Sequence, residues 1–224
     1  MLYVNGDSYS ADMANFKVYG HYLADKLSIP LINQASVGSC NDRIFRTTME
    51  YIASLSDQEK PLIVIGFSFF TRDEVWLKNI DNYKNHIQDF DQSHFVSMAW
   101  LLQNKNIDAE TKSLIVEQNI NKQIINFYTK LYMLTKILKS LNLTYFIFSA
   151  AENEDYKDIN WGSLNNLSMY RSVVQDPNVC DFQKFNIPSW ARTNNITTTK
   201  TGHLLSDGHY KFADFLYNKI QQNL

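Results

Sequence analysis

The sequence contains little cysteine, no long apolar run and almost no net charge. Its two cysteines, Cys40 and Cys180, lie far apart, so we expect no disulfide framework and treat both as reduced, small apolar residues. A formal net charge of -2 gives no bulk attraction to nucleic acid or to an anionic membrane. No stretch approaches the roughly 18 apolar residues of a membrane-spanning helix. The first residues also lack the basic and apolar regions of a signal peptide, which predicts a cytoplasmic protein.

What the chain does contain is an alternation of short apolar runs and amphipathic stretches. Its 224 residues suffice for one large core, and we expect a single domain over residues 1–224. Runs typical of strands occur at 1–4, 29–33, 61–66 and 143–149. Apolar residues at helical spacing occur at 16–27, 42–55, 108–141 and 208–220. This order predicts a three-layer α/β/α sandwich with a parallel sheet, interrupted by an insertion at about 67–107.

The first apolar run is followed at once by Gly6, Asp7 and Ser8. In open parallel sheets, ligands bind beyond the carboxyl ends of the strands, so a serine at this point is placed where a nucleophile is useful. The same tripeptide also occurs by chance in polar turns. On its own it therefore indicates either a nucleophilic serine or an ordinary turn after the first strand.

A second polar group, Ser206-Asp207-Gly208-His209, stands at the start of the last predicted helix. A neutral histidine can take the proton of a serine hydroxyl, and an aspartate bound to its other ring nitrogen fixes the tautomer. Asp207 and His209 can meet in this way if the chain turns between them. The alternative is that Asp207 caps the helix and His209 is a surface residue of its first turn.

Taken together, the two ends of the chain resemble the SGNH (GDSL) hydrolase superfamily, and the resemblance covers nearly the whole chain in sequence order. Gly6-Asp7-Ser8 matches the block that supplies the nucleophile, and Asp207-Gly208-His209 resembles the block that supplies the acid and the base. The stretch 33–39 looks like the second block, whose glycine, here Gly38, helps to form the oxyanion hole. The resemblance implies a flavodoxin-like parallel sheet and a triad of Ser8, Asp207 and His209.

Two stretches, 38–46 and 65–72, also look like those of divergent members from bacteriophages. If the chain is encoded by a phage, the protein is expected to be virion-associated rather than free in the cytoplasm.

Two positions depart from the pattern of the family. The third block usually supplies an asparagine that donates to the oxyanion, whereas this chain has Ser68, whose hydroxyl rotates and is less preorganised. Asn41 in the neighbouring loop is an alternative donor. The acid usually stands three residues before the histidine, which would place it at Ser206, whereas some members resemble this chain in having a single residue between Asp207 and His209.

Other polar residues are weaker candidates. His203 is either a rival base, a substrate contact or a solvated loop histidine. Arg72 can bind a carboxylate on an acidic sugar or be a structural arginine. Asn41, Arg72 and His203 are therefore the candidate substrate-binding residues. A metal site at His203, Asp207 and His209 lacks a fourth ligand and a known spacing, so we expect no metal and no organic cofactor.

The resemblance implies a serine esterase that removes a small acyl group, such as acetyl, from a carbohydrate through an acyl-enzyme. The expected oxyanion donors are the backbone N–H groups of Ser8 and Gly38, with Ser68 as a third. The expected partner is a small-molecule or carbohydrate ester, and neither nucleic acid nor a membrane. An acyltransferase that uses the same triad, and a non-catalytic glycan-binding or structural module with this fold, remain as alternatives.

Overall fold

The structure is a computed structural model, and it describes residues 1–13, 15–70, 72, 74–76, 95–97, 120–152 and 159–223. Four parallel strands form its centre in the order β2-β1-β3-β6. These strands are β1 (Leu2–Gly6), β2 (Leu31–Asn33), β3 (Leu62–Phe67) and β6 (Tyr145–Ser149). Gly6 is in register with Gly66, so β1 and β3 end side by side. Loops that follow these strands therefore meet at one edge of the sheet.

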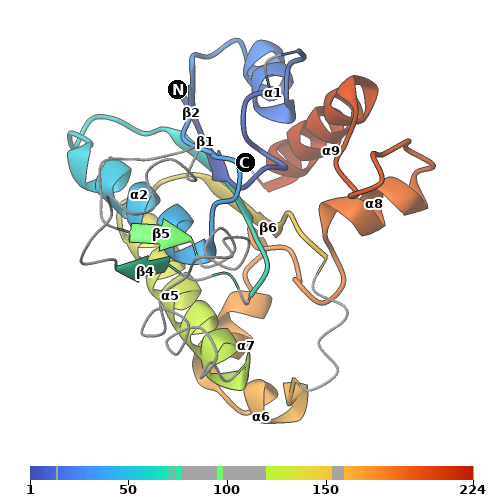
Figure 1. Ribbon diagram of the computed structural model, residues 1–224. Helices are drawn as coiled ribbons and strands as arrows, with labels where there is room; N and C mark the ends of the chain where they lie inside the picture. The colour runs from blue at the N-terminus through green and yellow to red at the C-terminus, as the bar shows by residue number, and fades with distance from the viewer. Residues whose placement is uncertain are drawn as a thin grey trace.

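Helices cover both faces of this sheet, which confirms the predicted α/β/α architecture. Successive strand residues point to opposite faces, so Tyr3 and Ile63 pack in one buried cluster while Leu2 and Val64 pack in the other. The first cluster lies under α2 (Asn41–Ser54) and α5 (Ile120–Ser140). The second lies under α1 (Tyr19–Leu27) and α9 (Ser206–Asn223), which contact each other although they come from opposite ends of the chain (Figure 1).

Between β6 and α9 the described residues form three short helices, α6 (Trp161–Asn165), α7 (Ser168–Val174) and α8 (Ile187–Thr193). Helix α8 begins at a capping box, in which the Asn186 side chain accepts the Ser189 N–H at 2.8 Å while Ser189 Oγ accepts the Asn186 N–H at 3.3 Å. Each of these helices is too short to show a clear apolar period in the sequence. After α8 the chain returns to the carboxyl end of β1, where His203 contacts Ser8.

Between β3 and α5 the structure describes one antiparallel pair, β4 (Glu74–Trp76) and β5 (Phe95–Ser97). The rest of the expected insertion at 67–107, and residues 108–119 of the expected long helix, lie mostly outside the described residues. None of the helices in the described ranges is both long and apolar enough to cross a membrane.

Candidate active site

Ser8 lies in a tight turn directly after β1. The carbonyl oxygen of Asp7 accepts the N–H groups of Ser10 and Ala11, each at 2.9 Å, and this closes the turn. Gly6 and Gly66 make room for the turn, because a Cβ on Gly66 would come within 3.0 Å of Ser10 Oγ. The turn leaves Ser8 half-buried at the carboxyl edge of the sheet.

His203, from the loop between α8 and α9, contacts the Ser8 hydroxyl. Ser8 Oγ and His203 Nε2 are 2.8 Å apart, although 195 positions separate the two residues in the sequence. The imidazole stacks on the Tyr9 ring, with centroids 4.2 Å apart and planes within 7°. A serine hydroxyl within hydrogen-bond distance of a histidine nitrogen is the basic arrangement of an activated nucleophile.

A compact turn holds His203 in this place. Thr199 N–H donates to the His203 carbonyl at 2.8 Å, and Gly202 N–H donates to the Thr199 carbonyl at 3.0 Å. Gly202 has φ +82°, a conformation that L side chains rarely adopt. The Tyr9 hydroxyl donates to the Thr201 carbonyl at 3.2 Å, so the residue after Ser8 helps to fix the turn that carries His203.

The structure does not bring His209 to Ser8. His209 lies in the first turns of α9 and is 3% exposed. Its Nδ1 accepts the backbone N–H of Tyr19 at 3.2 Å, and its ring packs beside Phe16 and Tyr19. The expected base is therefore a buried residue that joins α9 to the start of α1.

Asp207 also stands apart from the expected triad. Helix α9 begins at Ser206, so Asp207 and His209 are both helical and two residues apart, and such residues point to different sides of a helix. The Asp207 carboxylate is exposed and pairs with Lys211 one turn later, at 2.7 Å. The expectation of a turn between Asp207 and His209 fails because the helix starts earlier than the sequence predicts.

The hydroxyl of Ser68 is hydrogen-bonded to Asp7 and does not face an oxyanion site. The Ser68 hydroxyl donates to Asp7 Oδ2 at 2.6 Å, and both residues are fully buried. Asp7 Oδ1 accepts the Tyr9 N–H at 3.0 Å. Arg72 donates to Ser68 Oγ at 3.3 Å and lies 3.8 Å from Asp7 Oδ2, with about a quarter of its side chain exposed. The site thus holds a carboxylate and a guanidinium beside the turn that carries Ser8.

The side chain of Asn41 joins two loops instead of facing Ser8. Its Oδ1 accepts the Ser68 N–H at 2.8 Å, and its amide group donates to the Phe69 carbonyl at 3.0 Å. Gly38 lies in a separate turn with φ +77°. That loop is tied to the end of β1 by the Ser36 N–H, which donates to the Gly6 carbonyl at 3.1 Å. The loop with Gly38 is therefore held beside the strand that delivers Ser8.

Burial shifts the pKa values of His203, His209 and Asp7. Burial lowers the pKa of His203 below 6.5, with the nearby Asp7 carboxylate opposing this shift and Arg72 adding to it. Burial lowers the pKa of His209 to about 4, and the charge of His203 adds to this effect. Burial raises the pKa of Asp7, while the hydrogen bonds from Ser68 and Tyr9 oppose that rise. His203 is therefore neutral near pH 7 and able to accept a proton.

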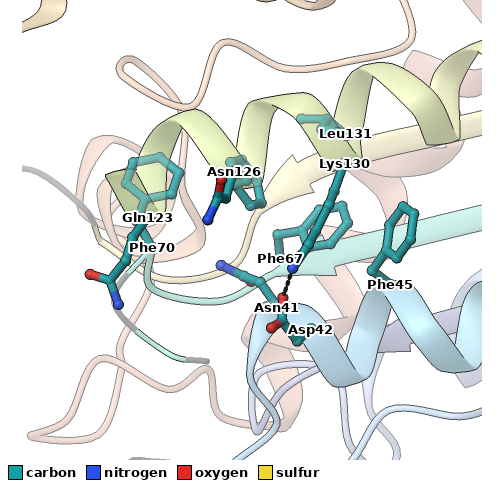
Figure 2. A pocket seen from close by; sticks show the side chains of 10 residues that line it. Asn41, Asp42, Phe45, Phe67, Phe70, Gln123, Asn126, Lys130 and Leu131 are labelled. Atoms are coloured by element: carbon teal, nitrogen blue, oxygen red, sulfur yellow. Dashed lines mark hydrogen bonds and ion pairs between the residues drawn. The ribbon is translucent and has the colours of Figure 1, made fainter. Parts of the chain in front are cut away.

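A separate cavity of about 60 Å³ lies between the start of α2 and α5 (Figure 2). Lys130 and Asp42 form an ion pair across it. Its wall combines aromatic, amide and charged side chains, from Asn41, Asp42, Phe45, Phe67, Phe70, Gln123, Asn126, Phe127, Lys130 and Leu131. Ser8 and His203 do not line it, so it is not the place where the hydroxyl and the imidazole meet. In the described ranges, no group of three or more His, Cys, Asp or Glu residues is arranged to hold a metal ion.

Comparisons with solved structures place this fold beside esterases. The psychrotrophic esterase EstA from Pseudoalteromonas sp. is similar with a TM-score of 0.51 and 14% identity, covering 99% of this chain and 96% of its own. Est2A, an acetyl xylan esterase from the rumen bacterium Butyrivibrio proteoclasticus, is similar with a TM-score of 0.51 and 11% identity, covering 99% of this chain and 63% of its own. No protein-family model and no curated protein matches the sequence. At these identities the likeness shows a shared α/β fold, with a parallel sheet between layers of helices.

Proposed function

We propose that this chain is a serine esterase in which Ser8 is the nucleophile and His203 is the general base. The observation that carries the proposal is the 2.8 Å contact between Ser8 Oγ and His203 Nε2 at the carboxyl edge of the parallel sheet. The lowered pKa of His203 supports it, because a base must be neutral before it can accept a proton. His203 takes the place that the sequence assigned to His209.

The reaction begins when Ser8 Oγ attacks the carbonyl carbon of an ester and His203 Nε2 takes the hydroxyl proton. The tetrahedral oxyanion accepts hydrogen bonds from the backbone N–H groups of Ser8 and Gly38. His203 then gives its proton to the leaving alkoxide, and the acyl group stays on Ser8. Water attacks the acyl-enzyme with His203 again as the base, which releases the acid and restores the hydroxyl.

Ser68 does not serve as the third oxyanion donor in this scheme, because its hydroxyl hydrogen is bound to Asp7. The amide of Asn41 is likewise bound to backbone carbonyls. Arg72 is the better candidate for the third oxyanion donor. Its side chain is partly exposed, and its charge lowers the pKa values of both Tyr9 and His203. A guanidinium beside the nucleophile favours the negative charge that develops on the carbonyl oxygen.

The substrate we propose is a small acyl ester, such as an acetyl ester, on a carbohydrate. The SGNH-like order of the blocks supports this class, and so does the fold shared with Est2A, which is an acetyl xylan esterase. The account uses neither a metal nor an organic cofactor. We also propose the SGNH subtype, in which the nucleophile follows β1 and the base precedes α9.

One observation favours a second candidate, a non-catalytic module that binds glycans. The nitrogen of His203 opposite Ser8 faces the Thr201 hydroxyl at 3.0 Å, where a complete triad has a carboxylate. Loss of the acid weakens catalysis without changing the shape of the site. A glycan screen with hits, together with an inert Ser8, would support this candidate.

The experiment compares wild-type protein, Ser8→Ala and Ser54→Ala on a chromogenic acetyl ester and on acetylated xylan oligosaccharides. Ser54 is an exposed serine at the end of α2, so its variant controls for the loss of a hydroxyl elsewhere. We expect turnover in wild type and Ser54→Ala and a loss of at least about 10³-fold in Ser8→Ala. Equal turnover in all three proteins, or none in any, would end the esterase proposal.

A further inference from the structure

Two threonine hydroxyls surround the side of His203 that faces away from Ser8. Thr201 Oγ1 lies 3.0 Å from His203 Nδ1 and 3.0 Å from Thr199 Oγ1. Thr199 Oγ1 also accepts the backbone N–H of His203 at 3.1 Å. The hydrogen bonds therefore run from the ring of His203 to Thr201, from Thr201 to Thr199, and from Thr199 back to the backbone N–H of His203.

The direction of these hydrogen bonds follows from the role of Ser8. For Nε2 to accept the Ser8 proton it must be bare, so the single proton of neutral His203 stands on Nδ1. Nδ1–H then donates to Thr201 Oγ1, whose own hydrogen is directed to Thr199 Oγ1. If Thr201 instead donated to Nδ1, the ring proton would move to Nε2 and Ser8 would lose its base.

We propose that Thr199 and Thr201 are positioning residues that hold His203 in the Nδ1–H tautomer, so that an uncharged hydroxyl pair replaces the carboxylate of a triad. This inference rests on the proposed function for its consequence in turnover. No proton leaves Nδ1 during the reaction: the Ser8 proton moves to Nε2, and the imidazolium keeps both protons until it protonates the leaving group.

A hydroxyl dipole stabilises the imidazolium less than a carboxylate does. Among the described residues, the Asp7 carboxylate and a backbone hydrogen bond with Thr201 raise the pKa of His203, and the Arg72 guanidinium lowers it. His203 in turn lowers the pKa of the neighbouring His209. The hydroxyl pair therefore gives orientation without adding negative charge beside the ring.

The first test removes each hydroxyl while keeping the branched shape of the side chain. We expect Thr201→Val and Thr199→Val each to lower kcat about tenfold with little change in KM, as for the loss of one neutral hydrogen bond. Thr199→Val should have a smaller effect in a Thr201→Val background than in wild type, because its contact with Thr201 is already lost and only its hydrogen bond from the His203 N–H remains. Serine at either position should restore the rate. Thr197→Val, which removes an exposed hydroxyl close to the same turn, is the matched control and should leave the rate unchanged.

The second test reads the tautomer directly and needs no turnover. Nitrogen NMR of ¹⁵N-histidine-labelled wild-type protein above the His203 pKa should show a protonated Nδ1 and a bare Nε2. Both valine variants should shift this population toward Nε2–H. An unchanged tautomer in both variants would overturn the positioning role. If the tautomer shifts while the wild-type protein hydrolyses no ester, the positioning role stands and the esterase proposal fails.

The third test places a carboxylate at the same point. Thr201→Asp should raise the His203 pKa, and the acid limb of the activity profile should move to higher pH with it, while kcat increases. An unchanged His203 titration would overturn the inference, because it would show that residue 201 does not face Nδ1.

Discussion

Ser8 and His203 come from opposite ends of the chain, and Tyr9 joins them. The Tyr9 ring supports the imidazole, its hydroxyl binds the Thr201 carbonyl, and its backbone N–H binds Asp7. The turn that carries Ser8 and the turn that carries His203 are thus joined through Tyr9. Such support is what keeps a nucleophile and its base at a fixed distance.

The pH dependence of the proposed reaction follows from the ionisation of His203. The base must be neutral, and burial lowers its pKa below 6.5. We therefore expect kcat/KM to rise with pH through a midpoint below 6.5 and to be nearly constant from there to about pH 8. A rate profile of wild-type protein between pH 4 and 9 measures this midpoint. A midpoint above 6.5 would contradict the environment of His203 described above.

Asp207 offers a direct comparison with the triad implied by the sequence. Its carboxylate is exposed and contacts Lys211, away from either histidine ring. Asp207→Asn should therefore change kcat/KM by less than about twofold, since exposed ion pairs contribute little. A loss near 10³-fold or more, as expected when a triad acid is removed, would show that Asp207 acts on the base after all.

The sequence pattern predicted a reactive Ser8 and preferred His209 over His203 as its partner, whereas the structure places His203 beside Ser8. Gly-Asp-Ser after an apolar run is a local pattern, whereas the contact with His203 depends on how residues 199–203 fold. The family pattern seeks an aspartate shortly before the base, and the residues before His203 are Lys200, Thr201 and Gly202. The sequence therefore favoured Asp207 with His209 and named His203 as a rival base, and only the three-dimensional turn shows that a threonine stands at the ring of His203.

At the scale of elements, the pairing of β1 with β3 and the turn after β1 need small residues at Gly6 and Gly66. A Cβ on Gly6 would come within 2.8 Å of the Gly66 carbonyl oxygen and would also meet the Ser10 side chain. Because β1 and β3 are paired at this point, neither backbone can move away without loss of the sheet. The close approach of the two strands fixes the place from which Ser8 projects.

Gly6→Ala should therefore destabilise the protein by about 1–3 kcal/mol, the usual range for overpacking a tight site. Gly162→Ala in α6 is the matched control, because the nearest atom to its added Cβ is Asn160 Oδ1 at 3.5 Å. Alanine there should be neutral or stabilising by up to about 1 kcal/mol, since glycine is a poor helix former. Urea unfolding of both variants measures the difference. Equal free energies of unfolding would contradict the close approach.

Helices and strands with a strong apolar periodicity or a continuous apolar run were predictable from the sequence, and the short helices were not. The buried strands and the helices α1, α2 and α9 lie within a few residues of their expected bounds, because each has a continuous apolar run or a stripe at helical spacing. The start of α9 at Ser206 was missed, since Gly208 suggested a later beginning. Because the helix starts at Ser206, Asp207 and His209 are both helical and point to different sides of α9.

At the scale of the whole molecule, the sheet separates two buried clusters. One side is closed by α2 and α5, and the other by α1 and α9. His209 belongs to the second side, where it accepts the Tyr19 N–H at the start of α1. The stability of this layer therefore depends on a neutral imidazole.

The free energy of unfolding should therefore depend on the protonation of His209. The folded pKa of His209 is about 4, below its ordinary value of 6.5, so its contribution is present above pH 6.5 and is lost as pH falls toward 4. The full loss is about 3 kcal/mol. Urea unfolding at pH 7, 5.5 and 4 should show a steeper fall for wild type than for His209→Gln, whose amide does not titrate. Parallel curves would contradict a buried, neutral His209.

The central claim is that His203, and not His209, activates Ser8. The rate at which a serine-directed phosphonate modifies Ser8, with the adduct located by mass spectrometry, tests it in wild type, His203→Gln and His209→Gln at pH 7.5. We expect Ser8 to be modified at similar rates in wild type and His209→Gln, and about 10²–10⁴ times more slowly in His203→Gln. Rapid modification in His203→Gln together with an inert Ser8 in a folded His209→Gln would contradict the account.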